Sequence, residues 1–214
     1  MSAARAVEFY FCAACPWSYL AFVRLVEAAQ RTAATIVFRP IVALDLPSSS
    51  GEVDRRRATQ RAVADYARKD LGDWARFCGV RLDAAASPPT STEWAQRGAV
   101  AAAGLGDARR YVAAVYRARF EHGIDIARRE AVAAIAAGCG LPGADFADRL
   151  DDPASLETVR GNRDELLRRG GFGSPSMFVA DTLYFGHDRL PLVEAALLHH
   201  GDRPFVAPGE HRIT

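Results

Sequence analysis

A strand–helix–strand pattern at the amino end limits the possible folds more than any other feature of this sequence. Residues 6–11, AVEFYF, are short, apolar and aromatic, as in a buried strand. Residues 16–31 place apolar and charged side chains on opposite faces of a helix. Residues 35–40, TIVFRP, predict a second strand. Two strands joined by one helix within this length predict a parallel βαβ unit.

The rest of the chain divides into a helical middle and a second strand-rich part. From about residue 53 to residue 169 the sequence is rich in Ala, Arg, Leu and Glu at helical spacing, and glycine- or proline-containing breaks delimit about five helices. Strand patterns return at 176–181 and 182–186, which are joined tightly enough to predict a hairpin. An amphipathic helix is predicted from Asp188 to about residue 200.

The order βαβ, helices, ββα predicts an α/β chain with a thioredoxin-like fold and an inserted all-helical domain. We expect residues 1–45 and 170–214 to form the thioredoxin-like domain and residues 46–169 to form the helical insertion. The 214 residues, half of them hydrophobic, are enough to bury a substantial core.

Composition excludes several classes of function. Lys and Arg number 27 against 26 Asp and Glu, so the formal net charge is +1 and no basic stripe predicts nucleic-acid binding. A small neutral or anionic molecule is therefore the expected substrate. The first residues lack the apolar run of a signal peptide, and no stretch of about 18 apolar residues predicts a membrane span. We expect a cytoplasmic protein without membrane association.

The four cysteines predict chemistry at one close pair. In a reducing compartment they are poor material for structural disulfides, so a close pair indicates catalytic or redox use. No second pair of Cys or His stands at ligand spacing, and we therefore predict no metal site. Cys78 and Cys139, each followed by glycine, are expected to fill space near helix ends.

Pro16 decides which cysteine of the segment CAACPWS carries the chemistry. Proline is favoured at the first helical position, which makes Cys15 the N-cap of the first helix. The Cys15 sulfur is then expected against the free N–H groups of Trp17 and Ser18, at the positive end of the helix dipole. That environment stabilises a thiolate, so Cys15 is the candidate nucleophile.

The position of Cys15 argues against a dithiol device of the thioredoxin type. Such a device needs a resolving cysteine three residues after the nucleophile, and Ser18 stands there. Cys12 lies at the exit of the first strand, so the Cys12–Cys15 pair spans the strand-to-helix corner. Two interpretations of Cys12 stay open. It is a strand residue without chemistry, or it forms a disulfide with Cys15 if their Cα atoms come within about 6 Å.

A second candidate constellation lies in residues 171–190. Pro175 directly precedes a predicted strand, where a thioredoxin-like fold places a cis-proline, and Ser174 would then offer its backbone to an extended thiol peptide. An ordinary loop proline is the alternative. His187 and Asp188 stand at the start of the last helix, whose free N–H groups can hold a carboxylate. Asp188 as a plain N-cap is the competing interpretation.

Three segments carry a resemblance to a known family. Residues 7–22, 70–80 and 171–197 resemble the 2-hydroxychromene-2-carboxylate isomerases and kappa-class glutathione transferases, within the DsbA-like thioredoxin superfamily. Members of this family depend on glutathione, hold its sulfur as a thiolate with a serine just before the first-helix proline, and are cytoplasmic or organellar dimers. The resemblance therefore implies glutathione, or another low-molecular-weight thiol, as cofactor, and a homodimer.

Carried over by position, the resemblance implies a set of site residues. Cys15 stands where the family has its serine, Cys12 where members usually have aspartate, and Ser174 where they often have valine. The implied catalytic residues are Cys15, Cys12 and Ser18. The implied cofactor-binding residues are Cys15, Pro16, Trp17, Ser174, Pro175, His187 and Asp188. The substrate pocket is expected between the thioredoxin-like core and the helices, lined by residues such as Trp17, Phe172 and aromatic residues of the inserted helices.

Three functions follow as hypotheses. The first is a glutathione-dependent isomerase or transferase acting on a small, electrophilic, aromatic-derived substrate. The second is a monothiol DsbA-like thiol–disulfide oxidoreductase that uses Cys15, with glutathione as the resolving partner. The third is a binding scaffold without turnover, which Ser18 and the absence of the aspartate permit.

Overall fold

A single mixed sheet of four strands organises the described part of the chain. The computed structural model describes residues 5–42, 56–82 and 91–198. The strand order is β2-β1-β3-β4, with β1 parallel to β2 and antiparallel to β3. The strands are β1 (Ala6–Phe11), β2 (Thr35–Pro40), β3 (Ser176–Val179) and β4 (Thr182–Phe185). The parallel βαβ unit and the antiparallel hairpin are both confirmed.

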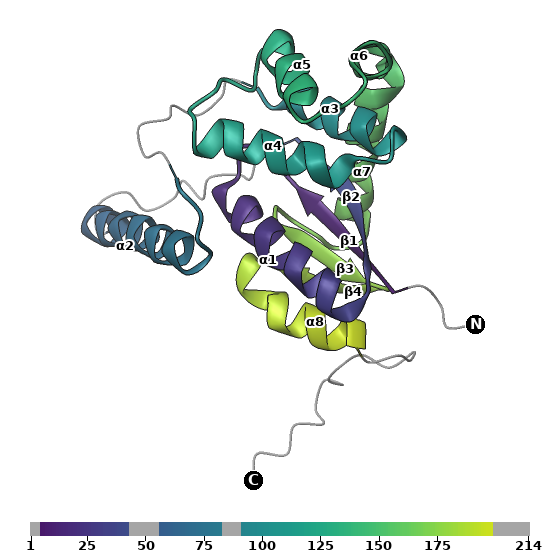
Figure 1. The fold of residues 1–214 in the computed structure, drawn as a ribbon. Coiled ribbons are helices and arrows are strands. Elements are labelled where there is room, and N and C mark those ends of the chain that lie inside the picture. The colour runs from purple at the N-terminus through teal and green to yellow at the C-terminus, as the bar shows by residue number, and fades with distance from the viewer. Residues whose placement is uncertain (1–4, 43–55, 83–90, 199–214) are drawn as a thin grey trace.

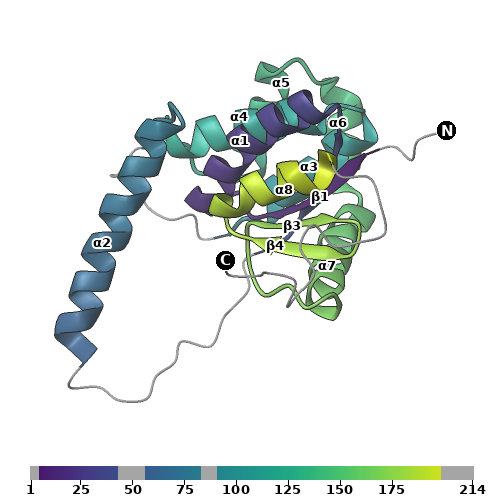
Figure 2. The same cartoon turned by 90° about the horizontal axis from the view of Figure 1, so that it is seen from below.

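Helices cover both faces of this sheet. Helix α1 (Pro16–Thr32) and helix α8 (Leu190–Leu198) pack together on one face, and α7 (Pro153–Arg168) lies on the other (Figure 2). This arrangement confirms the predicted fold class, an α/β thioredoxin-like fold with inserted helices. The predicted domain boundary near residue 45 lies outside the described residues, and the one near residue 169 stays a prediction.

The middle of the chain forms one more helix than the sequence predicted. Among the described residues between β2 and β3 there are six helices, where about five were predicted for this part of the chain (Figure 1). They are α2 (Arg56–Phe77), α3 (Glu93–Gly104), α4 (Ala108–Phe120), α5 (Arg129–Gly138), α6 (Gly143–Asp151) and α7. The missed boundary separates α6 from α7. There the Asp152 side chain caps α7 by accepting a hydrogen bond from the Ala154 N–H, and Pro153 occupies the first helical position.

The last helix begins later than predicted. His187–Arg189 form a short 3₁₀ turn, and α8 starts at Leu190 rather than at Asp188. Gly186 precedes the turn with a φ of 100°, a conformation that excludes regular helix at this point. The apolar side chains predicted to face inward are buried, namely those of Leu190, Val193 and Leu197.

One hydrophobic core joins the sheet to the inserted helices. Phe11 of β1 packs against Tyr116 of α4 with ring centroids 6.1 Å apart, and Phe22 of α1 packs against the same tyrosine at 5.6 Å. Gln96 of α3 adds a polar link, because its amide donates hydrogen bonds to the backbone oxygens of Phe11, at 2.7 Å, and of Ile41. These contacts fix the carboxyl ends of β1 and β2, where the candidate site begins.

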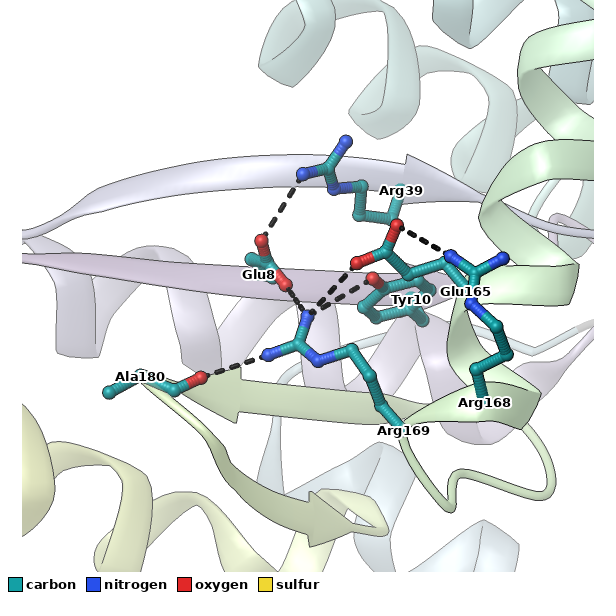
Figure 3. A network of polar contacts seen from close by, with 7 residues as sticks. All are labelled: Glu8, Tyr10, Arg39, Glu165, Arg168, Arg169 and Ala180. Carbon is teal, nitrogen blue, oxygen red and sulfur yellow. Dashed lines mark hydrogen bonds and ion pairs between the residues drawn. The ribbon is translucent and has the colours of Figure 1, made fainter.

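A network of charges ties the sheet to the end of α7 (Figure 3). Glu8 of β1 pairs with Arg39 of β2 at 3.2 Å and also with Arg169, which follows α7. The Arg169 guanidinium donates to the Ala180 carbonyl at 2.9 Å and lies 3.8 Å from the centroid of the Phe178 ring. Burial alone would raise the pKa of Glu8, but the hydrogen bonds from Arg169 and Arg39 outweigh it and the pKa lies below its usual range.

The Glu8 network leads to a pH-dependent stability prediction. Because the pKa of Glu8 is lower in the folded protein, its contribution to stability is present above the ordinary carboxyl pKa of 4.5 and is lost as the pH falls through the folded value. We expect Glu8→Gln to lower the free energy of unfolding at neutral pH by about 1–2 kcal/mol, since the side chains are half-buried.

Urea denaturation of both proteins at neutral pH and at roughly pH 3 measures this difference. The gap between them should close at the lower pH. Glu157→Gln, at an exposed position of α7, is the matched control and should change stability little at either pH. If Glu8→Gln and the wild type differed as much in free energy of unfolding at low pH as at neutral pH, the stabilising role given to the Glu8 carboxylate would be wrong.

Candidate active site

Cys15 caps the first helix, as the sequence predicted. Strand β1 ends at Phe11, and the Cys15 N–H donates to the Cys12 carbonyl at 3.0 Å, which closes a tight turn. Cys15 has an extended backbone and Pro16 follows at the first helical position. The side chain of Cys15 is half-buried. The turn therefore presents one thiol at the amino end of α1.

The direction of the Cys15 sulfur differs from the prediction. Its side chain makes no capping hydrogen bond, so the expected contact with the N–H groups of Trp17 and Ser18 is not formed. The thiol instead donates toward the Ser174 carbonyl, with Sγ 3.5 Å from the oxygen. A protonated thiol is a donor and seeks an acceptor, whereas amide N–H groups would attract it only as a thiolate.

The loop that faces Cys15 has the predicted geometry. The Ser174–Pro175 peptide bond is cis, so the alternative of an ordinary loop proline was wrong. The Pro175 carbonyl accepts a hydrogen bond from the Gly186 N–H at 3.0 Å, which holds this loop to the end of β4. The structure thus brings Cys15 and the cis-proline dipeptide together across 159 residues of sequence.

Cys12 lies behind the site and not on its surface. It is 2% exposed, and its Sγ lies 3.9 Å from the Thr92 hydroxyl at the start of α3. Burial raises the pKa of the Cys12 thiol. All four cysteines are free thiols, and Cys78 and Cys139 lie at helix ends as predicted. Cys12 and Cys15 are therefore neighbours that form no disulfide in this structure.

Ser18 is fully buried in the first turn of α1. It is close to the hydroxyl of Tyr116, whose pKa burial raises far above its usual value. The thiols of Cys15 and Cys12 raise that pKa further, and Ser18 opposes the rise. Ser18 is thus part of the buried packing around Tyr116, next to the two cysteines. Its catalytic role stays a prediction.

The ring of His187 contacts two tryptophans. Its ring stacks on Trp17, with centroids 4.7 Å apart and an interplanar angle of 22°, and meets Trp74 of α2 edge-on at 4.5 Å. His187 is 7% exposed, and within the described residues its Nε2 has no hydrogen-bond partner. Burial lowers the pKa of His187, so the ring is neutral at pH 7.

Asp188 is exposed and pairs with Arg189, with Nη1 and Oδ2 2.9 Å apart. It lies inside the 3₁₀ turn that Gly186 caps, so its interpretation as a plain N-cap was wrong. Asp188 and His187 are adjacent in sequence but differ in accessibility. His187 faces the tryptophans, and Asp188 faces outward.

Sequence reasoning expected aromatic residues of the inserted helices near the site but did not identify Trp74 of α2 as one of them. Arg24 of α1 donates to the His187 carbonyl at 3.0 Å, and its guanidinium lies 5.1 Å from the Trp74 ring centroid. These contacts hold the carboxyl end of α2 on the body, while the rest of this helix projects away from it (Figures 1 and 2). The segment 70–80, which carried part of the family resemblance, was the available signal, but helical spacing does not specify the surface that Trp74 contacts.

An exposed aromatic pair lies beside the cis-proline loop. Phe172 and Phe185 are 49% and 40% exposed, and their ring centroids are 4.4 Å apart. Phe172 was predicted to line the pocket, whereas Phe185, at the end of β4, was not. The Phe185 ring also lies so close to Gly173 that a Cβ there would come within 3.1 Å of it. The pair is therefore fixed against the loop that faces Cys15.

Two further observations concern the described residues, 5–42, 56–82 and 91–198. In these ranges no three His, Cys, Asp or Glu side chains are grouped closely enough to hold a metal ion. None of the helices there has the length and apolar character that crossing a membrane requires.

Comparison with known proteins places this geometry in a family. Residues 6–198 match the DsbA-like thioredoxin domain. A 2-hydroxychromene-2-carboxylate isomerase of Sphingobium xenophagum is 32% identical over 91% of this chain and 98% of its own length. One of Pseudomonas putida is 28% identical over 89% of this chain and 93% of its own length.

Solved structures agree with this match. The structure of a 2-hydroxychromene-2-carboxylate isomerase has a TM-score of 0.72 and 28% identity, covering 90% of this chain and 94% of that one. The cytosolic disulfide reductase DsbM of Pseudomonas aeruginosa, solved with GSH, has a TM-score of 0.61 over 84% of this chain and 88% of that one, and at 18% identity it shows the fold alone. The chain belongs to the DsbA-like thioredoxin domain family and, within it, to the group of its relatives named 2-hydroxychromene-2-carboxylate isomerases.

Proposed function

We propose that the protein is a glutathione-dependent isomerase of the 2-hydroxychromene-2-carboxylate isomerase type. The observation that carries this proposal is the Cys15 sulfur beside the cis Ser174–Pro175 peptide, at the amino end of α1. Relatives across nearly the whole chain bear the isomerase name. The substrate we propose is a small, electrophilic, aromatic-derived molecule.

The residues of the site fit a thiol peptide such as glutathione. Among the described residues, the Ser174 carbonyl is engaged only by a weak thiol donor, which leaves this backbone available to pair with a cysteinyl residue. His187 stacks on Trp17, two residues after Cys15, and carries a buried Nε2 without a hydrogen-bond partner among the described residues; the exposed Asp188 follows it. We assign the cysteinyl part of the cofactor to Ser174 and Pro175, and a carboxylate of the cofactor to the segment that begins with His187 and Asp188.

The chain itself would prepare the reaction by electrostatics and orientation. When bound, glutathione supplies a nucleophilic sulfur for reversible addition to an electrophilic carbon. Cys15 is a donor at the positive end of the α1 dipole, where negative charge on a neighbouring sulfur is stabilised. The stacked rings of Trp17 and His187 exclude water from one side of the site.

The exposed aromatic pair supports an aromatic-derived substrate. Phe172 and Phe185 present ring surface directly beside the cis-proline loop, where a flat apolar substrate can stack. Trp17, two residues after Cys15, offers a second aromatic ring near the site. A homodimer and a cytoplasmic location remain predictions that follow from the family resemblance and the sequence.

A thiol–disulfide oxidoreductase is the second candidate, and the identity of residue 15 favours it. A thiol stands where the family resemblance implies a hydroxyl, and it is half-buried rather than sealed in the core. The Cys15 thiolate would attack a disulfide sulfur and release one thiol, and glutathione would then attack the mixed disulfide to free Cys15. The two candidates differ in whether the Cys15 sulfur forms a covalent bond.

Removal of the cofactor tests the isomerase directly. We expect protein freed of small thiols by gel filtration to lose turnover of 2-hydroxychromene-2-carboxylate, because the nucleophilic sulfur comes from the cofactor. Added reduced glutathione should restore the rate with saturation, whereas S-methylglutathione, which lacks a free thiol, should not. Absorbance measurements of the isomerisation give the rates. Full turnover by the thiol-free protein would defeat the proposal.

Substitution of Cys15 separates the two candidates. We expect Cys15→Ser to keep isomerisation within about tenfold, since a hydroxyl still donates at the helix end, and Cys15→Ala to lose about 100-fold in kcat through loss of that donor. Both variants should lose exchange with a small disulfide. Cys78→Ser, at a half-buried helix end, is the control and should retain both activities. An inactive Cys15→Ser variant would favour the oxidoreductase.

A further inference from the structure

Cys12 is a buried thiol that the family resemblance places among the catalytic residues but that has no step of its own in the isomerisation proposed above. It lies three residues before Cys15 and on the opposite side of the turn that joins β1 to α1. We propose that Cys12 is the resolving thiol for Cys15, so that a reversible Cys12–Cys15 disulfide forms with small disulfides and switches off the thiol-binding site. The inference requires a reactive Cys15 and does not depend on the isomerase activity.

The turn places the two residues at disulfide distance. The Cys15 N–H donates to the Cys12 carbonyl at 3.0 Å, and Ala13 and Ala14 occupy the two central positions. A hydrogen-bonded turn of this kind keeps its first and fourth Cα atoms within about 7 Å. Disulfides span Cα separations of about 4.4–6.8 Å. Closing the bond therefore requires no unwinding of β1 or α1.

The hydrogen bonds that the two sulfurs make to Thr92 and Ser174 are long. Tyr116 lies beside the turn that carries both cysteines, because its hydroxyl donates to the Cys12 carbonyl at 3.5 Å. The Cys12 sulfur is 3.9 Å from Thr92 Oγ1, and the Cys15 sulfur is 3.5 Å from the Ser174 carbonyl. Thiol hydrogen bonds are weak, so rotation of both side chains toward each other breaks no strong interaction.

Accessibility sets the order of the steps. Cys15 is half-buried and Cys12 is 2% exposed, so Cys15 meets the oxidant first. Its thiolate attacks one sulfur of glutathione disulfide, forms a mixed disulfide and releases one glutathione. Cys12 then loses its proton and attacks the Cys15 sulfur, which releases the second glutathione. The protein dithiol loses two electrons and two protons, and glutathione disulfide is reduced to two thiols.

The oxidised form would lack the feature on which the proposed cofactor site depends. In the disulfide the Cys15 sulfur turns away from Ser174 toward Cys12, so it no longer faces the cis-proline loop. Because burial raises the pKa of Cys12, the second step should be slow at neutral pH and should accelerate as the pH rises. The disulfide thus closes gradually under oxidising conditions and reopens with excess reduced thiol.

Intact-mass spectrometry after treatment with glutathione disulfide tests the inference. The starting protein carries Cys78→Ser and Cys139→Ser, so that only the proposed pair can react. We expect this protein to lose two hydrogens and to retain no glutathione. The same protein with Cys12→Ala should retain one glutathione on Cys15, and with Cys15→Ala it should remain unmodified. Titration of free thiols provides an independent count.

Two results would overturn the inference. The first is that the protein with both Cys12 and Cys15 retains as much glutathione as the Cys12→Ala variant does. The second is that this protein keeps both thiols free under conditions in which the Cys12→Ala variant gains glutathione. If Cys12→Ala unfolds, as judged by circular dichroism, Cys12→Ser takes its place beside the Thr92 hydroxyl. Since the measurement is a mass and not a turnover, failure of this inference is distinguishable from failure of the proposed isomerase.

Discussion

The hydrogen bond from the Cys15 N–H to the Cys12 carbonyl is the constraint on which the site depends. It ends β1 and starts α1 within one turn, and Pro16 makes the next residue helical from its first position. Without this turn the chain would reach α1 later, and the sulfur would leave the amino end of the helix. The parallel pairing of β1 with β2 and its antiparallel pairing with β3 then fix that end of the helix opposite the Ser174–Pro175 loop.

The inserted helices are structural parts of this arrangement. Gln96 of α3 holds the ends of both parallel strands, and Thr92 at the start of the same helix approaches the Cys12 sulfur. Tyr116 of α4 packs on Phe11 and donates to the Cys12 carbonyl at 3.5 Å. Each of these contacts reaches the same short turn. The amino end of α1 is therefore positioned by the inserted helices as well as by the sheet.

Local sequence rules predicted what depends on neighbouring residues. Pro16 identified the helix start and Cys15 as the cap, because proline restricts its own backbone geometry. The cis peptide at Pro175 was instead predicted from its place before a strand of a thioredoxin-like fold. The same rules did not find the break at Pro153, which was read as part of a longer helix. They also gave the wrong direction for the Cys15 sulfur, since its partner Ser174 is distant in sequence.

Aromatic residues of the inserted helices were expected near the site, but Trp74 was not identified among them for the same reason. Its contacts with His187 and Arg24 exist only once α2 packs beside α1. The sulfur position is thus set by the sheet and its first helix, whereas one neighbouring wall comes from a helix attached mainly at its carboxyl end. The turn that carries Cys15 is fixed by the sheet, whereas α2 is fixed mainly through the contacts of Trp74, and both contribute to the candidate site. A substitution at Trp74 would therefore change the surface beside His187 without altering the turn that carries the Cys15 sulfur.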